Sequence, residues 1–133
     1  MRVAELMQSN VRTVPSETSI AEAVVSLADA HITGMPVVDG TGRVVGVLST
    51  SDVLTAEAEV EDEDGRRRLL QDTAVQDIMT PRPFTVTPDD DVREAARQML
   101  YADVHRLFVT DGDRLIGVIS TTDIGRAVAN GAL

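Results

Sequence analysis

The sequence predicts an α/β (α+β) protein built from two pseudo-symmetric β-α-β-β-α units. Two observations lead to this fold class. The first is an internal duplication, because residues 3–7 return in similar form 72 positions later as residues 75–79, and residues 46–52 return as residues 117–123. The second is the apolar spacing, which alternates in each copy between extended and helical periods. We therefore divide the chain into a first unit (1–55), a linker (56–72) and a second unit (73–133).

The first unit begins with a short extended segment at residues 13–14, which ends at Pro15. A helix is expected next, because apolar residues between positions 20 and 28 recur at i, i+3, i+4, i+7 and i+8. Two apolar runs follow at residues 35–38 and 44–48 around a Gly/Asp turn, which is typical of a hairpin. A closing helix is expected from about Ser51.

The second unit repeats this order. An extended segment at residues 84–86 ends at Pro88, and apolar residues between positions 92 and 100 have the same helical spacing. The apolar runs at 107–110 and 115–119 predict a second hairpin. The closing helix is expected from about Thr122 and ends near a glycine suited to a C-cap.

The linker carries a run of acidic residues followed by three arginines. One interpretation is a partner-binding or pH-sensitive switch. The other, which we favour, is a solvated linker or the frayed end of a helix.

Composition excludes several classes of function. The 133 residues carry a formal net charge of −10, and all 12 basic residues are arginine, with no lysine and no cysteine. Disulfides, thiol nucleophiles and lysine Schiff bases are therefore excluded, and an acidic chain without a basic stripe is a poor candidate for binding nucleic acid or an anionic membrane. With two non-equivalent histidines and no cysteine, a metal site is not expected. No apolar run reaches the length of a membrane span and no signal peptide is recognisable, so we expect a cytoplasmic protein.

The repeated Gly-x-x-Ser-x-x-Asp segment carries the sharpest chemical signal. The spacing of Ser49 and Asp52, and of Ser120 and Asp123, is that of a helix capping box, which alone explains one copy. A ligand offers another explanation: the glycine admits a flat ligand, the serine lies among free helix amides, and the aspartate can accept from both hydroxyls of a ribose. Because the arrangement occurs twice at equivalent positions, we favour a functional role.

The two copies differ ahead of the first hairpin strand. The second copy has His105 and Arg106 where the first has Thr33 and Gly34. Arginine is a strong phosphate donor and histidine titrates near neutrality, although a lone His-Arg pair is more often a surface feature. Phosphate binding is therefore expected to favour the second copy.

Together these motifs resemble a pair of CBS domains, the family named after cystathionine β-synthase. Its strand-Gly-x-x-(Ser/Thr)-x-x-Asp-helix hallmark is matched by residues 46–52 and 117–123, and residues 35–39 and 77–81 are also similar to the family pattern. The resemblance implies that the two units pack through their sheets into one module. It also implies clefts that bind adenosine-containing ligands, and a homodimer.

The resemblance further implies roles for individual residues. Asp52 and Asp123 would hold the ribose hydroxyls. Contacts to ribose or phosphate would come from Ser49, Ser51, Ser120 and Thr122, and contacts to phosphate also from His105 and Arg106. The adenine edge would meet the backbone of Thr13, Val14, Thr85 and Val86. The adenine would be lined by Met35, Pro36 and Leu107.

The leading hypothesis is a stand-alone regulatory module that senses AMP, ADP or ATP, with S-adenosylmethionine or a dinucleotide compatible with the same ribose contacts. It has no catalytic residues and no catalytic cofactor, and it would act on an unidentified partner protein. The alternative is a nucleotide-independent dimerisation or interaction scaffold. An enzyme is the weakest hypothesis, because no motif places a histidine beside either serine.

Overall fold

The computed structural model describes residues 1–81 and 83–133, which form two compact units. The first-repeat unit contains Arg12–Pro83, and the second-repeat unit contains Met1–Val11 together with Phe84–Leu133. These boundaries differ from those of the sequence repeats, because the segment that opens each repeat packs on the unit of the other repeat.

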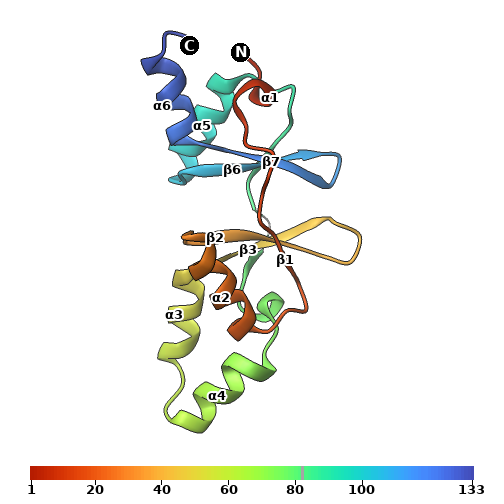
Figure 1. Ribbon diagram of the computed structural model, residues 1–133, viewed down its shortest axis with the longest axis vertical. Coiled ribbons are helices and arrows are strands. Elements are labelled where there is room, and N and C mark those ends of the chain that lie inside the picture. The colour runs from red at the N-terminus through yellow and green to blue at the C-terminus, as the bar shows by residue number, and fades with distance from the viewer. Residues whose placement is uncertain (82) are drawn as a thin grey trace. The chain divides into compact units, whose positions relative to one another are not determined.

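The first-repeat unit has a four-stranded sheet in the order β1-β2-β3-β4. The β1–β2 pair is parallel, and the other two pairs are antiparallel. Two helices, α2 and α3, lie on the same side of the β2–β3 hairpin (Figure 1). The bounds are β1 Val14–Pro15, α2 Ile20–Ala30, β2 Gly34–Val38, β3 Val44–Ser49, α3 Thr50–Ala58, α4 Glu63–Asp72, the 3₁₀ helix η1 Val75–Asp77 and β4 Thr80–Pro81.

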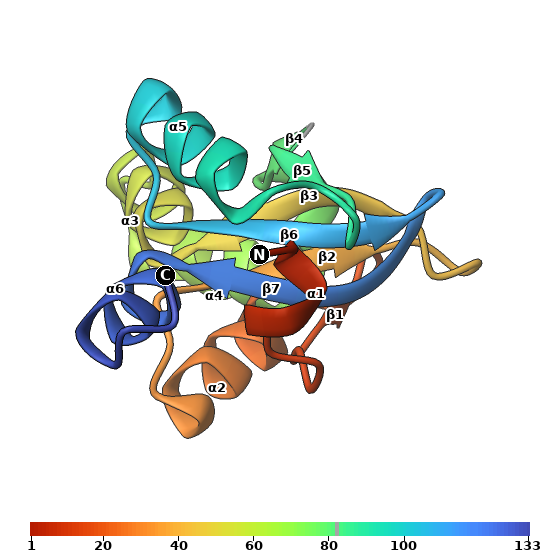
Figure 2. The same ribbon diagram turned by 90° about the horizontal axis from the view of Figure 1, so that it is seen from above.

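The second-repeat unit repeats this plan with a sheet in the order β5-β6-β7. Gln8 forms an antiparallel bridge with Val118, at the place that β4 takes in the other unit. Figure 2 looks onto the helical side, where α1, α5 and α6 lie over the β6–β7 hairpin. The bounds are α1 Val3–Leu6, β5 Thr85–Val86, α5 Val92–Ala102, β6 Arg106–Asp111, β7 Arg114–Ser120 and α6 Thr121–Ala129. Both predicted hairpins and all four predicted helices are confirmed.

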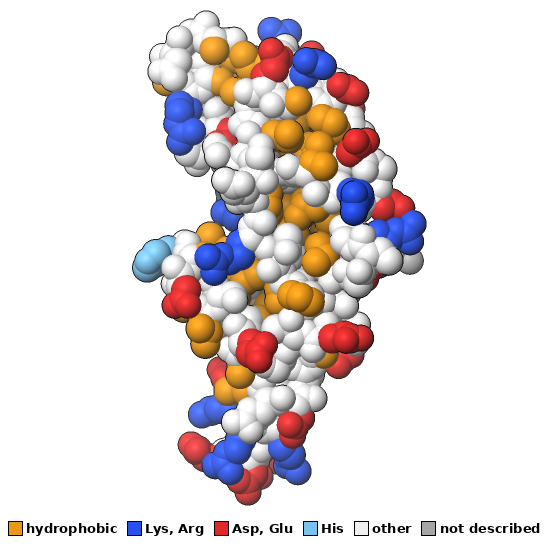
Figure 3. All heavy atoms as spheres, turned by 45° about the vertical axis from the view of Figure 1, so that its right-hand side comes forward, with side chains coloured by type: hydrophobic (Ala, Val, Ile, Leu, Met, Phe, Trp, Pro, Cys, Tyr) orange, Lys and Arg blue, Asp and Glu red, His pale blue; other side chains and the backbone are white. Residues whose placement is uncertain are grey.

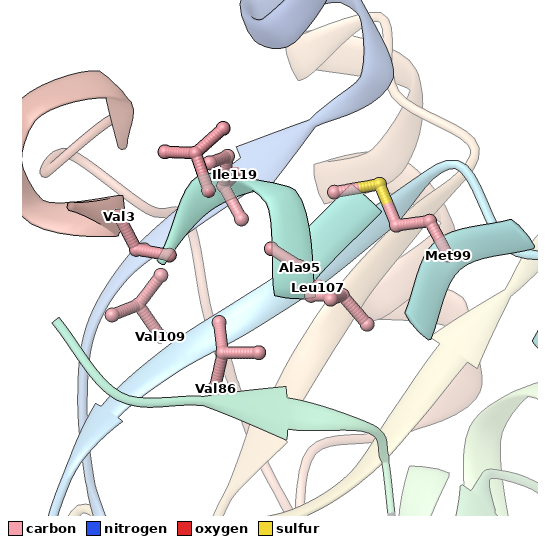
Figure 4. Packing of buried hydrophobic residues seen from close by; sticks show 8 residues of the cluster. Val3, Val86, Ala95, Met99, Leu107, Val109 and Ile119 are labelled. Atoms are coloured by element: carbon pink, nitrogen blue, oxygen red, sulfur yellow. The ribbon is translucent and has the colours of Figure 1, made fainter. Parts of the chain in front are cut away.

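Each unit has its own core between the sheet and the helices. Alternate strand residues point to the helical face, because side chains in a strand alternate between its two faces. In the second-repeat unit, Leu107, Val109 and Ile119 pack against Ala95 and Met99 of α5 (Figure 4). The corresponding cluster of the first-repeat unit is made of Val14, Ala23, Leu27, Met35, Val37, Leu48 and Val75.

The exchanged opening segments complete these cores. Val3 lies in the core of the second-repeat unit and Val75 in that of the first-repeat unit, and both are fully buried. Their backbone groups are also satisfied there, since the Val3 amide donates to the Asp90 carbonyl at 2.8 Å and the Val75 amide to the Thr18 carbonyl at 2.8 Å. Each unit therefore depends on a segment that belongs, by sequence, to the other repeat.

The linker between the repeats forms a helix where we expected a solvated linker or a frayed helix end. Asp62 caps α4 by accepting from the Gly65 amide at 2.7 Å. The helix lies against α2 and α3, and its Leu69 and Leu70 are half-buried, whereas residues 66–68, all arginine, are exposed. Acidic and basic side chains accordingly mingle at the α4 end of the surface view (Figure 3).

The turn between β2 and β3 is organised by the carboxylate of Asp39. Its Oδ1 atom accepts from the Thr41 hydroxyl at 2.7 Å and from the backbone amides of Thr41 and Arg43 at 2.9 and 3.1 Å. The Thr41 hydroxyl, followed by the two amides, lowers the pKa of Asp39 below its ordinary value of 3.8.

We expect the Asp39 carboxylate to titrate below 3.8 in the folded protein, and Thr41→Ala to move its midpoint upward. A lowered pKa means that this turn contributes stability above the unfolded pKa and loses it as the pH falls through the folded one. Carboxyl-carbon NMR titration measures both midpoints. A Thr41→Ala titration identical to wild type would contradict the assigned cause.

Candidate functional site

Both repeated Ser-x-x-Asp segments form a reciprocal capping box at the start of a helix. The Ser49 amide donates to Asp52 Oδ2 at 2.9 Å, and the Asp52 amide donates to Ser49 Oγ at 3.2 Å. Ser120 and Asp123 make the same two bonds at the same distances. The structural explanation of the motif is thus confirmed in both copies. Each capping box engages the Oδ2 atom of its aspartate and leaves the Oδ1 atom for further partners.

The second oxygen of each aspartate is met by a side chain from the exchanged segment. Asp52 Oδ1 accepts from the Thr80 hydroxyl at 3.1 Å, and Asp123 Oδ1 accepts from the Gln8 amide at 3.1 Å. Gln8 and Thr80 are 72 positions apart and therefore equivalent in the repeat. Sequence reasoning missed both, because an alignment of the copies does not show that each segment crosses to the other unit.

The glycine of the motif makes room for this crossing segment. A Cβ atom on Gly46 would lie 2.5 Å from Met79 Sδ and 2.8 Å from the Thr80 carbonyl oxygen. On Gly117 it would lie 2.8 Å from both Met7 Sδ and the Gln8 carbonyl oxygen. The protein itself therefore fills the space beside this glycine, which explains the glycine without a ligand.

Arg106 lies beside the serine of the second motif. Arg106 and Ser120 are direct partners in the β6–β7 register, so their side chains emerge close together on the same face of the sheet. This is the face opposite the core, because the next pair, Leu107 and Ile119, is buried among the helices. Gly34 takes the place of Arg106 opposite Ser49 in the first-repeat unit, so that position has no cation.

His105 has different neighbours from Arg106. Its side chain lines a hollow of about 250 Å³ between α5 and α6, together with Met99, Asp103, Thr121 and Ile124. Arg106 begins β6, whereas His105 precedes the strand in a bend, so the two side chains of the expected pair have different surroundings.

The other predicted site residues fall into two sets. Thr13, Thr85, Ser51 and Thr122 are exposed. The second set is buried, and strand alternation directs the Met35 and Leu107 side chains into the helical cores. The buried residues are Val14, Met35, Pro36, Val86 and Leu107.

Within the described residues, no three His, Cys, Asp or Glu side chains gather in a way that could hold a metal ion. Over residues 1–81 and 83–133, each helix is too short or too polar to cross a bilayer.

These features, a duplicated unit with a capped Ser-x-x-Asp helix after a hairpin, define a class of tandem α/β modules. The CBS domain profile matches residues 3–59 and 75–130. The chain therefore belongs to the CBS domain family, with two CBS repeats.

Curated relatives are considerably longer than this chain. The CBS domain-containing protein CBSX2, chloroplastic, of Arabidopsis thaliana is 28% identical over 141 residues, which cover 90% of this chain and 59% of the relative. The homoserine O-acetyltransferase of Methanohalobium evestigatum is 28% identical over 127 residues, covering 95% of this chain and 24% of the enzyme.

Solved structures resemble nearly the whole chain. CBSX2 in complex with AMP matches with a TM-score of 0.82 and 30% identity, over 99% of this chain and 98% of that one. The CBS domain pair of protein MJ0100 in complex with 5′-methylthioadenosine and S-adenosyl-L-methionine matches with a TM-score of 0.80 and 25% identity, over 98% of both chains.

Proposed function

We propose that this CBS pair is a regulatory module that binds an adenosine-containing ligand, with AMP, ADP or ATP as the leading candidates. The observation that carries the proposal is the grouping in the second-repeat unit of Arg106, Ser120 and Asp123 around the first turn of α6. Structures of similar CBS pairs contain AMP, 5′-methylthioadenosine or S-adenosylmethionine, which supports the adenosine class.

Each group in this site has a task that suits a nucleotide. A carboxylate such as Asp123 can accept from the two vicinal hydroxyls of a ribose. The N-terminus of α6 and the Arg106 guanidinium both favour a phosphate, because the helix end is partially positive and the guanidinium forms bidentate bonds. We propose that Asp52 and Ser49 hold a ribose in the first-repeat unit in the same way, without the phosphate preference. The role is one of binding rather than catalysis, in a cytoplasmic protein.

The test is calorimetry of the full chain with AMP, ADP, ATP, S-adenosylmethionine and adenosine. We expect Arg106→Gln to weaken AMP binding by about tenfold, the value of one charge-assisted hydrogen bond, and to leave adenosine binding unchanged. Arg114→Gln is the matched control, since it removes the same charge from an exposed position on the next strand. Absence of binding to every compound in the millimolar range would refute the proposal.

The alternative is an interaction scaffold that is indifferent to nucleotides. It is favoured by large apolar side chains left exposed on the helices, of which Leu54 is 65%, Leu100 83% and Tyr101 94% exposed. The same surfaces support our proposal that the module is a homodimer or docks on a regulated protein. Sedimentation with and without AMP separates the two, because only the sensor couples assembly or stability to the nucleotide.

A further inference from the structure

The two aspartates of the repeated motif differ in their surroundings. Asp123 is only 6% exposed, whereas Asp52 is half-buried. Asp123 Oδ2 accepts from both the amide and the hydroxyl of Ser120, at 2.9 and 3.0 Å, and its Oδ1 accepts from Gln8. The Arg126 guanidinium lies 3.6 Å from the same Oδ1, but it is 61% exposed and contributes little. The donor that fixes Oδ1 is therefore Gln8.

Gln8 is itself held firmly in place. The backbone amide of Gln8 donates to the Val118 carbonyl at 2.8 Å, and the backbone amide of Val118 donates back to the Gln8 carbonyl at 2.9 Å. The preceding residue, Met7, fills the space beside Gly117. The Gln8 side chain thus reaches Asp123 from a fixed backbone, across 115 residues of sequence.

We propose that Gln8 is the positioning residue of the second-repeat site and sets its selectivity for a ribose that carries both hydroxyls. This inference rests on the proposed function. With the Ser120 amide and hydroxyl on Oδ2 and Gln8 on Oδ1, the Asp123 carboxylate is fixed in its plane. One acceptor position remains on Oδ1 and the rotatable Ser120 hydroxyl can vacate a second on Oδ2, so both are directed before the ligand arrives. Without Gln8, the Oδ1 side of a buried carboxylate loses its donor and is free to reorient. Thr80 takes the same positioning role toward Asp52, with a shorter side chain that ends in a hydroxyl.

The experiment compares AMP with 2′-deoxy-AMP by calorimetry on the full chain. An Asp52→Asn background weakens the first-repeat site, so that the second-repeat site dominates AMP binding. Gln8→Ala removes the donor, and Gln8→Asn keeps the amide but shortens its reach, so the comparison stands if the alanine variant unfolds. Gln76→Ala is the matched control, because Gln76 is an exposed glutamine in the exchanged segment of the other unit.

We expect Gln8→Ala to weaken AMP binding about tenfold and 2′-deoxy-AMP binding much less, so that the ratio of the two affinities falls. The control should leave that ratio unchanged. The ratio does not respond to a uniform loss of folded protein, which separates positioning from stability.

Two results would overturn the inference alone: AMP binds and Gln8→Ala keeps the wild-type ratio, or both nucleotides weaken equally. Absence of AMP binding in the background protein, together with absence of binding in the wild type, would instead refute the proposed function, and the role of Gln8 with it.

Discussion

Asp123→Asn is expected to lower the affinity of the second-repeat site for AMP by about 30-fold. The carboxylate would accept two ribose hydroxyls through charge-assisted bonds, and each such bond is worth about 1 kcal/mol more than its neutral counterpart. The asparagine is nearly isosteric, so it removes the charge without opening a cavity. Thermal unfolding should show a modest loss of stability, because the Ser120 and Gln8 donors lose a charged acceptor.

Two further variants serve as references for Asp123→Asn: a charge control and the equivalent change in the first-repeat site. Asp111→Asn removes an equal charge from an exposed end of β6 and should leave AMP binding intact. Asp52→Asn should cost less AMP affinity than Asp123→Asn, because Gly34 stands where the second-repeat unit has Arg106. Equal losses from the two asparagine variants would contradict the expected preference of the second-repeat site for phosphate.

Gly117→Ala is expected to destabilise the protein by about 2 kcal/mol, the scale of an overpacked core. The new methyl group would lie 2.8 Å from the Gln8 carbonyl oxygen and from Met7 Sδ. The methionine can move aside, but the carbonyl is held by its bond from the Val118 amide. For a chain of this size the melting temperature should fall by roughly 5 to 10 °C, as measured by differential scanning calorimetry.

Gly125→Ala is the matched control for this glycine. It lies in α6 with nothing within 4 Å of an added Cβ, so it should be neutral or stabilising. Adding Met7→Ala to Gly117→Ala should recover only part of the loss, since the carbonyl contact remains. A Gly117→Ala protein as stable as wild type would show that the crossing segment does not require the glycine.

The fold was predictable where local pattern decides structure. The hairpins and the helices that pack on them follow from apolar spacing and turn residues, and the structure confirms them. The helix α4 was missed because its residues are mostly charged, and its stability comes from Leu69, Leu70 and packing on α2. The helix α4 therefore forms because of tertiary contacts, which a local sequence pattern does not show.

The site was predictable only in outline. The Ser-x-x-Asp spacing identified the capping boxes, but Gln8 and Thr80 could not be assigned to them, since duplication leaves open which copy a segment packs on. Strand alternation already indicates that Met35 and Leu107 face the helical cores, because both fall in register with core residues.

The exchange of opening segments also determines the order in which the molecule can fold during synthesis. Residues 12–83 are continuous, so the first-repeat unit can form as soon as this stretch has left the ribosome. The other unit needs Val3 and Gln8, which are made before this stretch, and β7 and α6, which are made after it. The segment that holds Val3 and Gln8 must therefore remain unpaired while residues 12–120 are made, and its apolar Val3, Leu6 and Met7 are exposed to chaperones or misassembly during that interval.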